Sequence, residues 1–182
     1  MSERAHDPFS LLGVPVSFSL TKRQIESAYL ARIAGAHPDH AGGGSGVDAA
    51  ALNDARRALL DAERRANLVL ASMGGPSASD DDSLPDGFLM EIMETRMEIE
   101  SALASGDPAE REKWTAWADE QRAEYTTRVA EAFATVSSGN PASGDGAGVL
   151  RDARRMLNAW RYIERLIEQL DPDYDPASAD FS

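Results

Sequence analysis

Apolar residues in this chain recur at intervals of three and four positions, the spacing that places them on one face of an α-helix. The pattern runs through most of the 182 residues, and no segment shows a convincing strand pattern. Helices with one apolar face become stable when that face packs against other helices. The sequence therefore predicts an all-α fold, with enough residues for one or two small domains.

Three helices are predicted in the first part of the chain, over residues 7–12, 21–36 and about 47–72. Asp7 is a suitable N-cap for the first of them, and Pro8 suits the first helical position. The two longer helices each carry an apolar stripe, so we expect their apolar faces to be buried.

Residues 74–86 are small, acidic and broken by prolines, which indicates a linker. Three further helices are predicted after it, over about 87–104, 107–136 and 149–170. They can form a three-helix bundle, or an antiparallel pair with the first helix packed against it. Residues 172–182 are predicted to be a loose tail.

The last two predicted helices have clear apolar stripes. The helix at 107–136 has a seven-residue repeat of Trp114, Trp117, Gln121, Tyr125, Val129, Ala132 and Val136. The helix at 149–170 has one stripe of Val149, Ala153, Met156, Trp160, Ile163, Ile167 and Leu170. These positions are the predicted core.

Charge and composition exclude several classes of protein. The formal net charge is −13, which argues against nucleic acids and anionic membranes as partners. Residues 1–75 are neutral overall, so the remaining residues carry the whole −13. The chain has no cysteine, and it has neither an apolar run typical of a signal peptide nor one long enough to span a membrane. We therefore expect a cytoplasmic protein.

The segment His37-Pro38-Asp39 follows a predicted helix and precedes a run of glycines. Pro38 cannot continue the helix, so the tripeptide is predicted to be a loop. His37, Asp39 and His40 are residue types that can bind a metal, but Pro38 separates them and few other ligands are near. No nucleophile motif accompanies the pair, so we expect no metal, no cofactor and no enzymatic activity. Considered alone, the tripeptide is an ordinary turn.

Its context changes that interpretation. The order "DPFSLLGVP", a capped amphipathic helix, "HPD", a loop and "LNDARRALLDAERRANLVL" resembles a J-domain over residues 7–72. The resemblance implies an antiparallel helical hairpin whose loop docks on a DnaK-type chaperone and stimulates its ATPase. His37, Pro38 and Asp39 then form the essential loop. The basic surface of the preceding helix is reduced to Lys22, Arg23 and Arg32.

The second half of the chain extends the resemblance. "DGFLMEIMETRMEIESAL" and "RYIERLIEQL" are similar to the HscB family of iron–sulfur co-chaperones. The resemblance implies an L-shaped protein with a J-domain at 1–73, an acidic linker at 74–86 and a client-binding helical bundle at 87–171. It also implies that the protein delivers an IscU-like scaffold protein to an HscA-type chaperone.

Helical periodicity divides the segment 87–104 into two apolar stripes. One stripe, expected to face the bundle, contains Phe88, Ile92, Ile99 and Leu103. The other, edged by Glu94, contains Leu89, Met90, Met93 and Met97. Methionines suit a surface that adapts to a client, so we expect this stripe to be exposed, joined by Tyr162 from the last helix. The alternative is that the methionines belong to the core.

The chain also departs from the family pattern. Ala34-Gly35-Ala36 replaces the basic residues that commonly precede the tripeptide, and His40 replaces the lysine after it. Docking on an acidic chaperone surface is then expected to be weaker, or the chaperone surface is expected to be matched differently. The alternative function is a J-domain adaptor of the same build that serves another client or lacks chaperone coupling.

Overall fold

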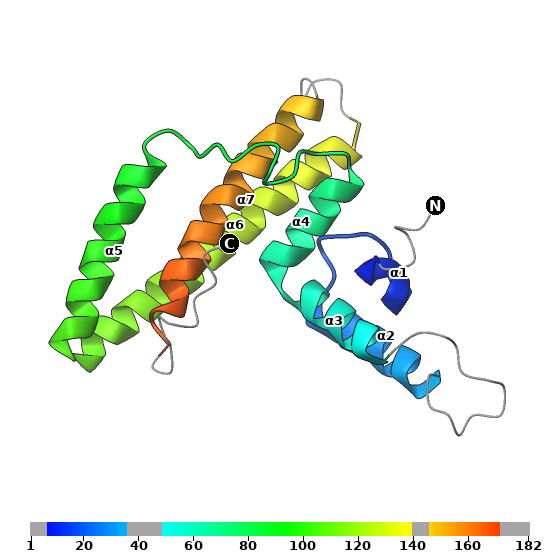
Figure 1. Ribbon diagram of the computed structural model, residues 1–182, viewed down its shortest axis with the longest axis horizontal. Coiled ribbons are helices and arrows are strands. Elements are labelled where there is room, and N and C mark those ends of the chain that lie inside the picture. Colours follow the sequence, from blue (N-terminus) through cyan, green and yellow to red (C-terminus); the bar gives the residue numbers. More distant parts are fainter. Residues whose placement is uncertain (1–6, 36–48, 140–145, 172–182) are drawn as a thin grey trace. The chain divides into compact units, whose positions relative to one another are not determined.

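The computed structural model describes residues 7–35, 49–139 and 146–171 (Figure 1). These residues form α-helices, turns and connecting segments, with no strand among them, as the periodicity predicts. The chain divides into two compact units, Met1–Gly74 and Gly75–Ser182. Each unit has its own apolar core.

The first unit contains the helices α1 (Pro8–Leu12), α2 (Lys22–Gly35), α3 (Ala49–Leu60) and α4 (Ala62–Ser72). α2 and α3 lie side by side, and α1 packs against both (Figure 1). The core of this unit is formed by Phe9, Leu12, Phe18, Leu20, Ile25, Leu52, Ala55, Leu59, Ala66, Val69 and Leu70.

The prediction of a single helix over residues 47–72 is wrong, because this segment forms two helices that meet at Asp61. The backbone of Asp61 is extended, with φ −74° and ψ 118°, and its carboxylate accepts a hydrogen bond from the backbone N–H of Arg64. Asp61 is thus the N-cap of α4. Aspartate favours such a position because its short side chain bonds to nearby backbone N–H groups in competition with the helix.

α4 is fixed in the first unit by a buried arginine. Arg65 donates from Nε to the carbonyl oxygen of Phe18 at 3.0 Å and from Nη1 to the carbonyl oxygen of Leu59. Its guanidinium also lies 5.3 Å from the centre of the Phe18 ring. Burial lowers the pKa of Arg65 from its ordinary value. The arginine therefore joins α4 to the end of α3 and to the segment that precedes α2.

The hairpin of α2 and α3 is joined by polar contacts as well as by apolar packing. Arg56 donates two hydrogen bonds to the carboxylate of Glu26, at 2.7 Å from Nε and 2.6 Å from Nη2. The Tyr29 hydroxyl donates to Oδ1 of Asn53 at 2.9 Å, and the Arg56 guanidinium lies over the Tyr29 ring. Bidentate pairing of this kind fixes the register of the two helices.

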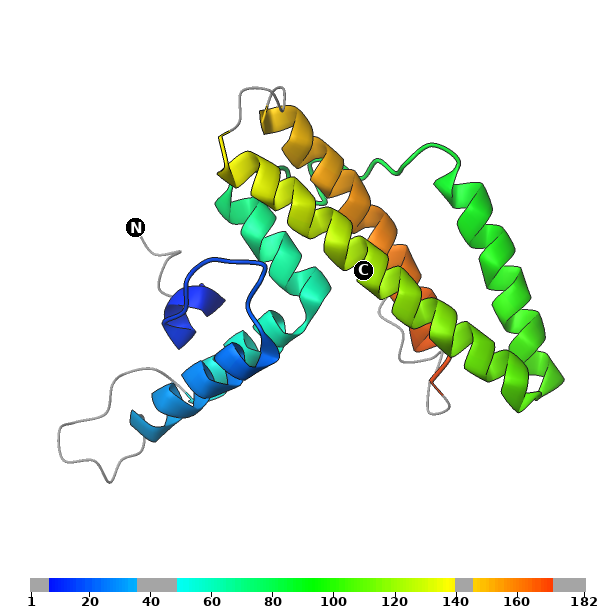
Figure 2. The same ribbon diagram turned by 180° about the vertical axis from the view of Figure 1, so that it is seen from behind.

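The second unit contains α5 (Phe88–Ser105), α6 (Pro108–Ser137) and α7 (Gly146–Glu168). α6 and α7 form a long antiparallel pair with the most extensive helix–helix contact in the described residues (Figure 1 and Figure 2). α5 packs against both helices with fewer contacts. This arrangement is the second of the two predicted for this region, a pair with the first helix packed against it.

The buried face of α6 differs from the predicted seven-residue repeat. The buried residues are Trp114, Ala118, Tyr125, Val129 and Phe133. The predicted core positions Trp117, Gln121, Ala132 and Val136 are only half-buried. Positions 114 and 125, like 118 and 129, are 11 residues apart, close to three whole turns of an α-helix. The buried face therefore follows the period of a straight helix, around which a strict seven-residue repeat drifts by about 20° per repeat.

Part of the predicted linker packs against α7. Asn158, buried on α7, donates hydrogen bonds of 2.9 Å to the carbonyl oxygens of Asp81 and Ser83. Its own side-chain oxygen accepts from Nε of the buried Arg154 at 2.9 Å. Arg155 donates to the Ser83 hydroxyl. The contacts explain why α7 is buried around most of its circumference, including two polar positions that the stripe at 149–170 does not predict.

Candidate partner-binding surfaces

α5 presents four large apolar side chains to solvent, and we call Leu89, Met90, Met93 and Met97 the methionine surface. Their exposed fractions are 54%, 70%, 65% and 69%. Most of each side chain therefore lies outside the core. The four residues are the stripe that helical periodicity predicts to be exposed.

The opposite face of α5 is buried. Phe88 and Ile92 are 7% exposed, and Ile99 is fully buried. Leu103 is only half-buried, and the neighbouring Ala102 is buried in its place, so the inward face shifts slightly near the end of the helix. The second unit covers one side of α5 only, because α5 packs sparsely against α6 and α7.

Tyr162 on α7 lies beside the first turn of α5. Its ring meets the ring of Phe88 edge to face, with centroids 6.1 Å apart and planes inclined by 70°. Tyr162 remains 41% exposed, whereas Phe88 is buried. Glu94 is exposed beside Met93 and forms no ion pair within the described residues.

The chemistry of the methionine surface suits protein binding. Burying exposed apolar side chains is favourable by about 25 cal/mol per Å². Unbranched methionines adapt to irregular partner surfaces. The other large apolar side chains exposed in the described residues, Val16 and Leu30, stand singly and form no comparable patch.

The basic residues predicted to dock a chaperone lie on α2. Lys22, Arg23 and Arg32 are all exposed. Arg32 also covers Gly13, the left-handed C-cap of α1, so closely that a Cβ atom there would collide with the guanidinium. Arg32 therefore contributes to the packing of α1 on α2, whereas Lys22 and Arg23 lie at the start of the helix. His37, Pro38 and Asp39 lie outside the described residues, as do Ala36 and His40.

Glu26 is the carboxylate of α2 nearest these basic residues, and it is paired with Arg56 of α3. The hydrogen bonds from Arg56 hold the pKa of Glu26 below its ordinary value, with smaller contributions from the charges of Arg56 and Lys22. Glu26 also raises the pKa of Arg56. This carboxylate faces α3, so it offsets little of the positive charge that Arg23 presents outward.

Sequence reasoning missed a polar feature at the other end of α5. The indole N–H of Trp114 on α6 is buried and has no hydrogen-bond acceptor in the described part of the chain. An unpaired buried donor costs about 1–3 kcal/mol. A buried tryptophan usually finds an acceptor for its indole N–H, so a tryptophan in an apolar stripe raises the question of which group accepts. Whether an acceptor is present depends on the neighbouring helices, which the sequence does not place.

Comparison with known proteins adds to this geometry. The model of the HSCB C-terminal oligomerisation domain matches residues 84–171. A co-chaperone protein HscB homolog of Burkholderia thailandensis is 31% identical over 170 residues, covering 89% of this chain and 90% of that protein. The chain belongs to the HscB co-chaperone family.

Other HscB relatives match over different lengths. The homolog of Bordetella pertussis is 28% identical and covers 91% of this chain and 95% of its own. The homolog of Vibrio cholerae strain M66-2 is 37% identical over 108 residues, which are 55% of this chain and 63% of that protein. HscB proteins are co-chaperones and form no family of enzymes.

Solved HscB structures share the fold. The crystal structure of human co-chaperone protein HscB has a TM-score of 0.65 with 24% identity, covering 90% of this chain and 80% of that one. Chaperone HscB from Vibrio cholerae has a TM-score of 0.54 with 25% identity, covering 91% and 99%. The layout of an N-terminal J-domain followed by a helical bundle agrees with these HscB structures.

The described residues lack two further kinds of feature. They contain no group of three or more histidine, aspartate or glutamate side chains that could hold a metal ion. Within the same ranges, each helix is too short or too polar to cross a membrane.

Proposed function

We propose that this HscB-family protein is a non-enzymatic, cytoplasmic co-chaperone. In this proposal it stimulates a DnaK- or HscA-type ATPase and delivers an IscU-like iron–sulfur scaffold protein to it. The observation that carries the proposal is the methionine surface, a wide apolar face left exposed on a helix whose other face is buried. Membership of the HscB family supports both partners. The net charge of −13 favours protein partners over nucleic acid or anionic membranes.

The chaperone is bound by the first unit. His37, Pro38 and Asp39 form the docking loop, in which the Asp39 carboxylate takes charge-assisted hydrogen bonds from an arginine of the chaperone. Pro38 restricts the backbone that presents this carboxylate. Lys22, Arg23 and Arg32 add electrostatic attraction to an acidic chaperone surface, which raises the association rate more than the affinity.

The scaffold protein is bound by the second unit. Leu89, Met90, Met93 and Met97 supply the apolar contact, and Tyr162 adds an aromatic side chain from α7. Exposed tyrosines of this kind combine a rigid apolar ring with a polar hydroxyl, and they are frequent hot spots of protein interfaces. Glu94, unpaired at the edge, is available to a basic residue of the scaffold.

The test is the steady-state ATP hydrolysis of the chaperone, measured with the scaffold protein present. Wild-type protein is expected to stimulate hydrolysis, and Asp39→Asn is expected to abolish the stimulation because it removes the charge that the chaperone's arginine recognises. The circular dichroism and melting of the variant are expected to match those of the wild type. Undiminished stimulation by Asp39→Asn contradicts the proposed docking.

One observation favours the alternative, an adaptor that lacks chaperone coupling or serves another client. Ala34-Gly35-Ala36 and His40 flank the tripeptide where basic residues are expected. If wild-type protein binds the scaffold but leaves the ATPase unstimulated, this alternative holds. If it stimulates the ATPase but does not bind the scaffold, the client is another protein.

A further inference from the structure

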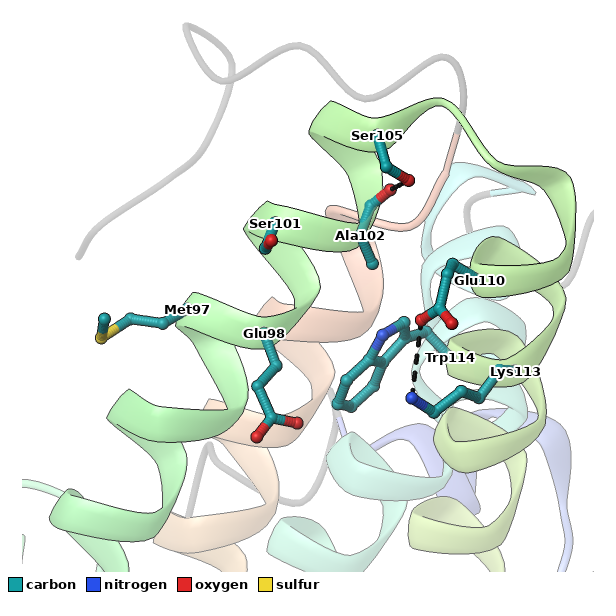
Figure 3. A pocket seen from close by; sticks show the side chains of 8 residues that line it. All are labelled: Met97, Glu98, Ser101, Ala102, Ser105, Glu110, Lys113 and Trp114. Atoms are coloured by element: carbon teal, nitrogen blue, oxygen red, sulfur yellow. Dashed lines mark hydrogen bonds and ion pairs between the residues drawn. The ribbon is translucent and has the colours of Figure 1, made fainter.

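The methionine surface places three thioether side chains on one face of α5. Met90, Met93 and Met97 are spaced by three and four residues, so they leave the helix on the same side. Their exposed fractions of 70%, 65% and 69% are the highest among the large apolar side chains of the described residues. Figure 3 shows the Met97 side chain directed away from α6, with its sulfur clear of the other labelled side chains. Small solutes therefore reach these side chains in the free protein.

The other three of the six methionines are less accessible or lie outside the described residues. Met73 at the end of α4 and Met156 on α7 are half-buried, and Met1 lies outside the described ranges. The chain has no cysteine, so methionine is the only sulfur-containing residue that it offers to an oxidant. Because oxidation of sulfur follows its exposure, the methionine surface is where this chain is most readily oxidised.

The oxidation in question transfers one oxygen atom from hydrogen peroxide to a thioether. The sulfur lone pair attacks one peroxide oxygen, an S–O bond forms and the O–O bond breaks. The departing hydroxide takes the proton from the transferred oxygen, so the products are methionine sulfoxide and water. Residues 76–182 contain 10 lysines and arginines against 23 aspartates and glutamates, which repels anionic oxidants but not this neutral one.

A sulfoxide has opposite consequences for the free protein and for its complex. It converts a flexible apolar side chain into a polar one. On the exposed face of α5 the added oxygen is hydrated, so the fold is unaffected. Against an apolar client the same oxygen would be buried without a donor, which weakens binding. Of the four residues in the methionine surface, only Leu89 keeps its apolar character.

We propose that the methionine surface is a reversible oxidation site that switches client binding off. Hydrogen peroxide converts Met90, Met93 and Met97 of the free protein to sulfoxides, which the client does not accept. A methionine sulfoxide reductase restores the thioethers, because the oxygen leaves as water while two thiols are oxidised to a disulfide. A bound client covers the three sulfurs, so the switch acts on the free co-chaperone. The proposal rests on the proposed binding of a client at this surface.

The first test measures the oxidation of each methionine in the full-length protein. Samples are taken at increasing times in hydrogen peroxide and analysed by peptide mass spectrometry. Met90, Met93 and Met97 are expected to be oxidised before Met73 and Met156, with no change in the melting curve while only these three are modified. The scaffold protein, added in excess, is expected to slow their oxidation. Equal rates at Met156 and at the three surface methionines overturn the assigned site.

The second test measures scaffold binding by calorimetry before and after oxidation. Catalase removes the peroxide before the scaffold is added, so that the scaffold itself is not oxidised. The oxidised wild type is expected to bind at least about 10-fold more weakly. Treatment with the two methionine sulfoxide reductases, one for each sulfoxide epimer, and dithiothreitol is expected to restore the affinity. An unchanged affinity after the three methionines are fully oxidised overturns the switch.

Two variants identify the responsible sulfurs. The triple variant Met90→Leu, Met93→Leu and Met97→Leu keeps the volume and the apolar character of the surface but removes its sulfurs. It is expected to bind the scaffold about as tightly as the wild type and to keep that affinity after peroxide treatment. Met156→Leu keeps the three surface sulfurs and is expected to lose affinity on oxidation as the wild type does. The switch is overturned if the triple variant remains sensitive or Met156→Leu becomes insensitive.

Failure of the proposed function gives a different result. If the untreated wild type binds no scaffold, the proposed client is wrong. Retention on a phenyl column then still decides whether oxidation changes the polarity of the surface. The oxidised wild type is expected to elute earlier than the untreated protein, and the triple leucine variant is expected to elute at the same position before and after treatment. Equal retention of oxidised and untreated wild type overturns the oxidation site as a polarity switch.

Discussion

Phe88 and Tyr162 meet edge to face, with ring centroids 6.1 Å apart, although they belong to different helices. Phe88 is buried and Tyr162 is 41% exposed, so the pair connects the core of the second unit with its surface. The contact fixes where the tyrosine of α7 stands relative to the first turn of α5. A client bound at the methionine surface, as proposed, would meet side chains from two helices whose relative position is held by the core.

Tyr162→Ala is expected to weaken scaffold binding by about 10-fold or more, the loss typical of an aromatic hot spot. Tyr162→Phe keeps the edge-to-face contact with Phe88 and is expected to retain most of the affinity. Calorimetric titration of both variants with the scaffold protein measures the difference. If Tyr162→Ala binds like the wild type, Tyr162 lies outside the client interface.

Met93→Asp is expected to abolish scaffold binding while the thermal midpoint barely changes. Met93 is 65% exposed, so an aspartate there stays hydrated in the free protein. Against an apolar client the same carboxylate would be buried without a partner, at a cost of several kcal/mol, on the order of 3–5.

Ile92→Asp is the matched control, one position away on the buried face. It is expected to destabilise the second unit by about 3 kcal/mol or more, because a charge replaces a core side chain. Thermal melting followed by circular dichroism separates the two variants. If Met93→Asp melts as low as Ile92→Asp, the methionines stabilise the fold, and the methionine surface is no client site.

Reversing Lys22 and Arg23 to glutamate is expected to slow association with the chaperone without affecting the fold. Both side chains are exposed, and the wild-type rate should fall as salt is added. Arg32→Glu is a poorer test, because Arg32 also covers Gly13 at the end of α1. Stopped-flow association rates at several salt concentrations give the answer. A rate that does not depend on salt places the docking surface elsewhere.

The Glu26–Arg56 pair is expected to make the stability of the first unit depend on pH. Arg56 lowers the pKa of Glu26 in the folded protein. The pair therefore stabilises the fold above the pKa of a glutamate in the unfolded chain, about 4.3, and this contribution is lost as the pH falls through the folded value. Glu26→Gln should melt below the wild type at pH 7, and the difference should become smaller as the pH is lowered toward 3.

An Arg56→Gln background provides the control for this pH dependence. Without the guanidinium, Glu26 loses the donor that lowers its pKa, so Glu26→Gln should then have nearly the same effect at both pH values. Melting curves of the four proteins at pH 7 and pH 3 complete the cycle. A pH-dependent difference that persists without Arg56 assigns the effect to another group.

Local sequence patterns determined the helices and the two faces of α5. The periodicity of 87–104 separated Ile92 from Met93 correctly because burial in an α-helix repeats every 3.6 residues, whatever the helix packs against. Asp107 and Pro108 marked the start of α6 for the same local reason, since an N-cap bonds to its own first turn. The break at Asp61 is also a local feature, because this N-cap bonds to the first turn of α4. The prediction missed it because the apolar stripe continues from one helix to the next across Asp61.

Tertiary structure alone decided which polar groups are paired. The contact of Asn158 with the carbonyls of Asp81 and Ser83 spans 77 and 75 residues, so no window of the sequence contains it. The burial of Arg65 and the orphaned N–H of Trp114 likewise depend on what the neighbouring segments bring within about 3 Å. Periodicity fixes the direction in which a side chain leaves its helix, but a hydrogen bond requires its partner at one distance and one angle, and only the packed fold sets both.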